Sequence, residues 1–187
     1  MTKQEILLAA AQVFGEKGYH AASMQDIADA VRLQKPSLYH HVKGKQELLA
    51  GILDQALDML IERMQAVVTQ DAPAGEKIRG ALVAYQRAMA EFPDLAAVLL
   101  LEHRSLDPAR RKDHVRKRDQ FEAMWADLIK AGVQDGEFAC EDPRLAAKAL
   151  LGVANWTVTW FRPNGRLSAG EIARVNADLL LNGLQTR

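Results

Sequence analysis

The sequence predicts an all-α protein in which a small three-helix head precedes a larger helical domain. Apolar residues recur every three to four positions along the chain of 187 residues, and no segment keeps the two-residue alternation of a half-buried strand. Signals for helix starts and helix ends divide the chain into about nine helices. We expect the head to cover residues 1–46 and the larger domain to cover 47–187, with no linker between them.

Three helices are expected within the head. A first helix over about 3–17 ends at Gly18, and a second of about two turns packs its apolar side against the first. Proline is tolerated in a first helical turn, so Pro36 places the start of a third helix near Lys35. The first two helices begin at capping boxes, formed by Thr2 with Glu5 and by Ser23 with Asp26.

The remaining helices follow from similar local signals. A long helix over about 45–68 is closed by the sequence DAPAG at 71–75. Asp107-Pro108, Asp142-Pro143 and the capping box from Ser168 to Glu171 mark three later starts. The expected ranges after residue 75 are about 76–91, 94–104, 108–132, 143–161 and 169–183.

Composition restricts the class of protein. Basic and acidic residues both number 24, so overall charge indicates neither a nucleic-acid partner nor a membrane partner. The single cysteine, Cys140, excludes an intramolecular disulfide and a multi-cysteine zinc site and suits the cytoplasm. The start has no secretory signal, and no run approaches the roughly 18 apolar residues of a membrane helix.

The segment QKPSLYHHVKGK, residues 34–45, gathers the side chains with the most chemistry. Three short helices with a turn before the third form a helix-turn-helix pattern, whose last helix enters the major groove of DNA. At 100° per residue, Leu38 and Val42 share the inward face, and Pro36 and His40 point the other way. Lys35 and Ser37 could then reach base edges. The side chains suited to phosphate oxygens are Tyr39, His41 and Lys45.

Three other interpretations of this segment compete with DNA recognition. Adjacent histidines on a helix diverge by about 100°, and none of the five histidines has metal-ligand spacing, so we expect no metal. A catalytic pair with Ser37 lacks an acid to orient the base, so we expect neither catalytic residues nor a cofactor. A merely solvated helix face is the default for isolated residues, but the combined pattern favours DNA recognition.

The segment 34–45, together with the two helices before it, resembles the N-terminal domain of the TetR family of bacterial transcriptional regulators. The resemblance implies base contacts from Gln25, Lys35, Pro36 and Ser37, and backbone contacts from Ser23, Tyr39, His41 and Lys45, with His40 on the same exposed edge. Arg32 stands where the family usually has glycine, so the turn there is expected to be altered or strained. The matching residues are Ile6, Ala9, Ala10, Phe14, Gly18, Ile27, Ala28, Pro36 to Val42, Lys45 and Leu48.

The last two helices are apolar on more than one side. Such a helix is covered on two sides, either inside one chain or against the same helices of a second copy in a four-helix interface. The family resemblance implies the homodimer, because two recognition helices must reach half-sites about one DNA turn apart. The residues expected in that interface are Ala149, Gly152, Val153, Trp156, Val175 and Leu179.

The middle helices supply more apolar surface than the head requires. Most of these side chains are expected in the core, but the resemblance implies a cavity whose ligand spreads the two heads and releases DNA. The candidates for ligand contact are Met64, Leu82, Tyr85, Met89, Leu99, His103, Phe121, Met124, Trp125, Trp156 and Trp160.

Two features bear on the ligand. The stretch 155–173 resembles TetR-family regulators of fatty-acid, steroid and aromatic-acid breakdown, several of which respond to acyl-CoA thioesters. The basic run RRKDHVRKR at 110–118 is either a clamp for CoA phosphates or a solvated helix face.

The sequence therefore predicts a homodimeric, ligand-responsive repressor. Its expected partners are palindromic operator DNA and a small hydrophobic effector, with acyl-CoA as the candidate class, and no membrane. The alternatives are a TetR-like regulator of an efflux pump that responds to lipophilic toxic compounds, and a small helical enzyme that does not bind DNA.

Overall fold

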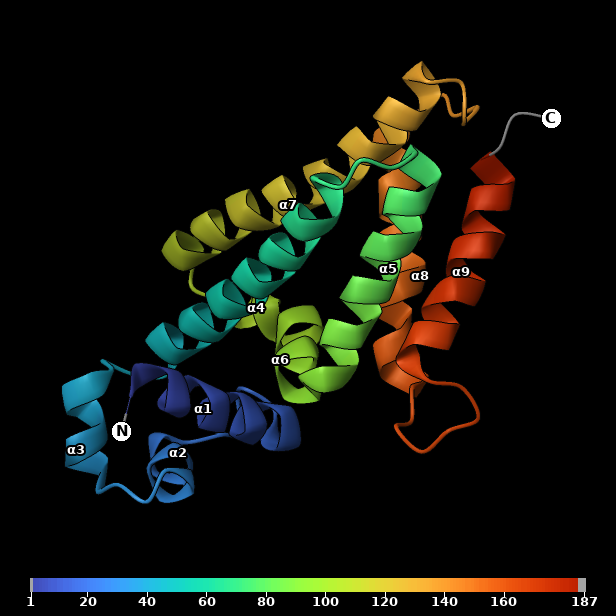
Figure 1. Ribbon diagram of the computed structural model, residues 1–187. Helices are drawn as coiled ribbons and strands as arrows, with labels where there is room; N and C mark the ends of the chain where they lie inside the picture. Colours follow the sequence, from blue (N-terminus) through green and yellow to red (C-terminus); the bar gives the residue numbers. More distant parts are fainter. Residues whose placement is uncertain (1, 185–187) are drawn as a thin grey trace. The chain divides into compact units, whose positions relative to one another are not determined.

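The computed structural model describes residues 2–184 and is helical throughout (Figure 1). The predicted all-α class is confirmed, and most helix ends lie within two residues of the prediction. The elements are α1 (Lys3–Lys17), α2 (Met24–Ala30), α3 (Lys35–His41), α4 (Lys45–Val68), α5 (Ala74–Glu91), α6 (Pro93–Ala97), η1 (Val98–Glu102), η2 (His103–Ser105), α7 (Pro108–Gln134), α8 (Pro143–Trp160) and α9 (Ala169–Leu184).

The predicted helix caps are present. At α1 the Glu5 N–H donates to Thr2 Oγ1 at 3.2 Å, and the Thr2 N–H donates to Glu5 Oε2 at 2.6 Å. The boxes of Ser23 with Asp26 and of Ser168 with Glu171 have the same two-way bonding. Local signals within four residues therefore placed these helix starts correctly.

Two elements differ from the prediction. The α5 helix begins at Ala74, since the Glu137 carboxylate accepts the N–H groups of Ala74 and Gly75 at 2.8 and 3.0 Å. The expected helix over 94–104 is instead a short α-helix followed by a π-helical turn and a 3₁₀ turn. Hydrophobic spacing over so few residues does not distinguish these helix types.

The chain folds into two compact units. The first contains residues 1–58 and 92–117, and the second contains 59–91 and 118–187. These units are defined by packing and group α6, η1 and η2 with the first three helices. The predicted division into 1–46 and 47–187 stays a prediction.

The first unit packs α1 against α2 and α2 against α3, and the three helices lie together in Figure 1. Helix α6 approaches α1 so closely that a Cβ on Gly15 would lie 3.2 Å from Asp94 Oδ1. Large side chains buried in the core of this unit include Phe14, Ile6, Ile27, Leu38 and Leu48. Leu38 thus anchors the third helix to the other two.

The second unit packs α5 against α8 and α9, which run side by side in Figure 1. Polar bonds cross the α5–α8 contact: Tyr85 Oη donates to Asn155 Oδ1, and Gln86 Nε2 donates to Thr157 Oγ1 at 3.2 Å. The buried side chains include Ile78, Leu82, Trp125, Ile129 and Leu150. These polar bonds fix the register of α8 on α5.

Candidate functional site

Helix α3 presents a polar edge to solvent. Leu38 and Val42 are 0% and 2% exposed, which confirms the predicted inward face. On the two flanks of the helix, Tyr39 is 46% exposed and Ser37 is half-buried. The other predicted DNA-contacting side chains of this segment, Lys35, Pro36, His40 and His41, are exposed. Their orientation fits base and phosphate contact, while the contacts themselves stay predictions.

The exposed residues at the start of α2 are already bonded within the head. Ser23 Oγ accepts the Asp26 N–H at 3.1 Å, so the hydroxyl serves as the helix cap. Gln25 Nε2 donates to Asp29 Oδ1 at 2.8 Å. Hydrogen bonds from Lys17 and then from Ser23 lower the pKa of Asp26 to about 2. Contact of Ser23 or Gln25 with DNA requires their hydrogen bonds to be shared or exchanged.

The turn before α3 is built on Arg32. This residue has φ +54°, the left-handed region that favours glycine, and among residues 2–184 it is the single non-glycine residue with positive φ. The Leu33 N–H donates to the Ala28 carbonyl at 2.9 Å, which is the long bond of a Schellman motif. The expected departure at Arg32 is therefore an ordinary helix ending that carries an unfavourable residue.

Lys45 points into the head. Its ammonium donates to the backbone carbonyls of Ala22 and His20 and lies 4.5 Å from the centre of the Tyr19 ring. These contacts tie the start of α4 to the turn between α1 and α2. The predicted phosphate contact of Lys45 stays a prediction, and the structure adds a second role for this side chain.

A hydrogen-bond network that sequence reasoning missed joins the head to the segment before α7. Gln46 Nε2 donates to Tyr19 Oη and to the Ser105 carbonyl, both at 2.8 Å, and Gln46 Oε1 accepts the Asp107 N–H at 2.9 Å. The Tyr19 N–H donates to Glu102 Oε1 at 3.1 Å. No local pattern identifies these partners, because they are 27 to 83 residues apart.

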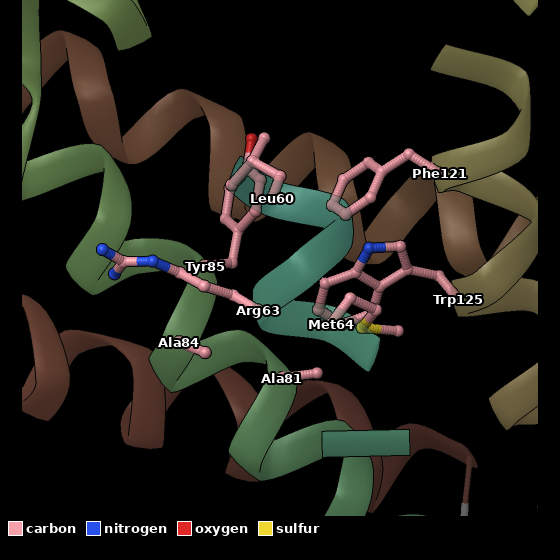
Figure 2. A pocket seen from close by; sticks show the side chains of 8 residues that line it. All are labelled: Leu60, Arg63, Met64, Ala81, Ala84, Tyr85, Phe121 and Trp125. Atoms are coloured by element: carbon pink, nitrogen blue, oxygen red, sulfur yellow. The ribbon is translucent and has the colours of Figure 1, made fainter. Parts of the chain in front are cut away.

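The second unit contains a small pocket between α4, α5 and α7 (Figure 2). Three aromatic rings form one wall. Tyr85 stacks on Phe121 with 6.0 Å between ring centres, and the Trp125 ring meets Tyr85 and Phe121 edge to face, with centres 6.3 and 6.2 Å away. Burial raises the pKa of Tyr85 far above its usual range, so its hydroxyl stays protonated. The open volume, with solvent at the mouth included, is about 170 Å³. The lining residues are Leu60, Arg63, Met64, Ala81, Ala84, Tyr85, Phe121 and Trp125.

Four of the predicted ligand contacts, Met64, Tyr85, Phe121 and Trp125, line this pocket. Leu82 and Met89 are buried in the same unit and Met124 is half-buried, but none of the three lines the pocket. Leu99 and His103 belong to the first unit, and Trp156 and Trp160 are exposed on α8. The structure thus leaves these last four outside the pocket, because apolar spacing alone does not tell which helix face meets which neighbour.

The basic run at 110–118 is largely neutralised within the fold. Four of its six basic side chains pair with carboxylates, which favours the interpretation as a solvated face over that of a phosphate clamp. Lys117 also bonds a second acid, Asp58, at 2.6 Å. The pairs are Arg110 with Asp107, Arg116 with Asp113, Lys117 with Asp54, and Arg118 with Asp119.

An apolar face on α8 and α9 lies open to solvent. Trp156 is 67% exposed and Leu179 is 70% exposed, although large apolar side chains are usually covered. The opposite side of α8 buries Leu150 and Ala154, so the helix is apolar on two sides, as predicted. All six residues expected at the dimer interface, Ala149, Gly152, Val153, Trp156, Val175 and Leu179, are exposed on this face.

Neither a metal-binding cluster nor a membrane-spanning helix is found in the described part of the chain. Residues 2–184 hold no group of three His, Cys, Asp or Glu side chains that could bind a metal ion. No helix in that range is long and apolar enough to cross a membrane.

Two family models match separate parts of the chain. Residues 6–52 match the model of the tetR family of bacterial regulatory proteins, and residues 71–184 match that of the tetracyclin repressor-like C-terminal domain. The chain is 29% identical to the HTH-type transcriptional repressor KstR2 of Mycolicibacterium smegmatis, covering 97% of this chain and 90% of that repressor.

Two solved structures resemble the whole chain. The TetR-family regulator PfmR of Thermus thermophilus has a TM-score of 0.89 at 36% identity, covering 97% of this chain and 99% of that one. The structure of AibR in complex with isovaleryl coenzyme A and operator DNA has a TM-score of 0.86 at 28% identity, covering 98% and 97%.

Proposed function

Because the chain belongs to the TetR family of bacterial regulatory proteins, we propose that it is a homodimeric repressor released from operator DNA by a small apolar effector. The observation that carries this proposal is the exposed polar edge of α3, which Leu38 fixes from beneath. The effector class that we propose is an acyl-CoA thioester, since AibR is a similar protein whose structure holds isovaleryl coenzyme A and operator DNA.

The head would read DNA with the first turn of α3. Lys35 and Ser37 at this end reach base edges, while Tyr39 and His41 lie toward phosphates. The helix has only seven residues, so one groove is all that a single head can read. A second head is therefore needed to give an operator enough base pairs for specificity.

The second head would belong to a second copy of the chain, bound through the open face of α8 and α9. Exposed aromatic and aliphatic side chains around Ala149 and Gly152 fit a four-helix interface, in which small residues allow close approach of the helices. A twofold axis through this face makes the interface self-complementary, so each copy buries the Trp156 of the other.

Release would follow from differential binding. An effector in the aromatic pocket need only bind the DNA-incompetent arrangement more tightly, and a 100-fold preference shifts the equilibrium by about 2.7 kcal/mol. The pocket is small as it stands: its open volume of about 170 Å³ lies below the about 300–1,000 Å³ of typical ligand pockets. Met64 is the flexible side chain in its wall and is the one best able to move.

Binding to the DNA upstream of the protein's own gene tests the proposed function. We expect a steep salt dependence, with log affinity falling by about 0.9 per phosphate contact for each unit of log salt. Lys35→Ala should relax base preference, Lys45→Ala should weaken all sequences about equally, and the exposed Lys130→Ala is the control that should change neither. Absence of operator binding below micromolar protein would overturn the proposal.

Two further measurements test the dimer and the effector. Leu179→Glu should shift the sedimenting species from dimer to monomer and abolish tight operator binding, while Lys130→Glu at an exposed polar position of α7 should leave both intact. A panel of acyl-CoA thioesters of graded chain length should include one that lowers operator affinity and raises the melting temperature. If no thioester does either, the acyl-CoA class is wrong.

A further inference from the structure

Trp125 carries a buried hydrogen-bond donor that has no acceptor. The side chain is 0% exposed, and its indole Nε1 is one of the buried polar atoms without a partner among the described residues. Burial of an unsatisfied N–H is costly, and buried polar groups in folded proteins are nearly always bonded. The unpaired donor therefore calls for a partner that the chain itself does not supply.

The donor faces the aromatic pocket. Trp125 lines it from α7, and Figure 2 shows the indole edge that carries the nitrogen turned toward the other labelled side chains. Leu60 and Phe121 have no acceptor atom, and the hydroxyl of Tyr85 is bonded to Asn155. An acceptor that enters the pocket would thus meet this N–H without competition from another donor in the aromatic wall.

The charge of the lining selects the kind of acceptor. The one cation in the wall, Arg63, bonds Glu91 at 2.7 Å, and no lining residue is acidic. A buried carboxylate needs a charge partner, and a neutral carbonyl needs only one donor. The remaining wall is aliphatic and aromatic, so the groups beside the acceptor must be apolar.

We propose that this pocket recognises a neutral carbonyl oxygen flanked by apolar carbon, and that Trp125 Nε1–H donates the hydrogen bond that selects it. The inference rests on the proposed function, because it takes this pocket as the effector site. The open volume of about 170 Å³ includes solvent at the mouth, so the flexible side chain of Met64 must move to admit a short acyl group or a single ring. Thioesters and ketones both supply such an oxygen.

Matched probes separate carbonyl recognition from hydrophobic filling. Isovaleryl coenzyme A and acetophenone carry the carbonyl, and ethylbenzene has the skeleton of acetophenone without the oxygen. Wild-type protein should bind acetophenone more tightly than ethylbenzene. Trp125→Phe should weaken the carbonyl probe about tenfold and ethylbenzene little, because one hydrogen bond is lost. Phe121→Leu trims the same wall but keeps the donor, so it should weaken both alike.

Nuclear magnetic resonance of the wild-type protein reports on the Trp125 donor directly, and the variant is needed only to assign its signal. The chain has three tryptophans, and the Trp125 indole N–H signal is the one missing in Trp125→Phe. A carbonyl probe should move that signal downfield, and ethylbenzene should not. A response to isovaleryl coenzyme A alone assigns the site to thioesters, and a response to acetophenone as well extends it to ketones.

Several results would overturn the inference. These are an unchanged ratio of the two affinities in Trp125→Phe, a Trp125 signal that stays still while a carbonyl probe saturates, or no binding of either carbonyl probe. In each case, intact operator binding by the same protein would still support the proposed repressor function. Loss of operator binding by wild-type protein would instead refute the proposed function, whatever the probes do.

Discussion

Replacement of Arg32 by glycine should stabilise the protein. Arg32 holds φ +54° in the turn before α3, and its side chain is exposed. A non-glycine residue in this conformation costs about 1–2 kcal/mol, and glycine loses about 0.5–1 kcal/mol more backbone entropy on folding. The difference predicts a gain of about 0.5–1 kcal/mol in the free energy of unfolding, with the Leu33 to Ala28 hydrogen bond preserved.

A series at this position isolates the backbone effect. Arg32→Asn should lie between glycine and arginine, because asparagine tolerates the left-handed region, and Arg32→Val should be the least stable because it is β-branched. Urea unfolding at one fixed protein concentration measures the free energies, since dimer stability depends on concentration. The gain for glycine corresponds to a melting temperature higher by about 1–4 °C.

The order of stability among the Arg32 variants tests whether the left-handed backbone conformation destabilises the turn. If Arg32→Gly were less stable than the parent, the side chain would contribute more than the backbone costs, and the reasoning from φ would fail. If valine and glycine were equally stable, the turn would not hold a left-handed residue at this position in solution.

Three other perturbations have defined outcomes. The Asp26 carboxyl, whose hydrogen bonds to a lysine and to the capping serine lower its pKa to about 2, contributes stability above the unfolded pKa of about 4. That contribution is lost as pH falls from about 4 to 2, so Asp26→Asn should flatten the pH dependence of unfolding there; an unchanged slope would contradict the assignment. Gly132→Ala should cost about 1–3 kcal/mol, because its Cβ would lie 2.3 Å from the ring of Phe138, whereas Gly183→Ala meets nothing within 4 Å and should not destabilise α9. Gln46→Met removes three hydrogen bonds to partly buried groups and should cost about 1–3 kcal/mol; hydrogen exchange of the 102–107 backbone should quicken, and unchanged protection would refute the bridging role.

Much of the DNA-facing head could be predicted from local sequence. The start of α3 at Lys35, its inward Leu38 and the two capping boxes each depend on residues no more than four positions apart. Hydrogen bonds and side-chain contacts at that spacing form within one helix or turn, so the printed order of residues is enough to identify them.

The pocket was harder to predict for a physical reason. Helical spacing marks Tyr85, Trp125 and Trp156 alike as apolar, yet the first two line the pocket and the third lies in solvent. Which face of a helix is covered depends on the neighbours that pack against it, and those come from distant parts of the chain. The orphan N–H of Trp125 is likewise a property of its neighbours, which the residue type does not reveal.

The sequence by itself determined most of the helices, the capping boxes of Thr2, Ser23 and Ser168, the polar edge of α3 and the apolar excess on α8 and α9, since all of these arise from interactions between residues close along the chain. Only the tertiary structure decided that Lys45 points into the head, that Gln46 joins Tyr19 to Ser105, and that Glu137 caps α5. These bonds join residues 25 to 63 positions apart, and their partners are selected by how whole helices pack, which no local pattern records.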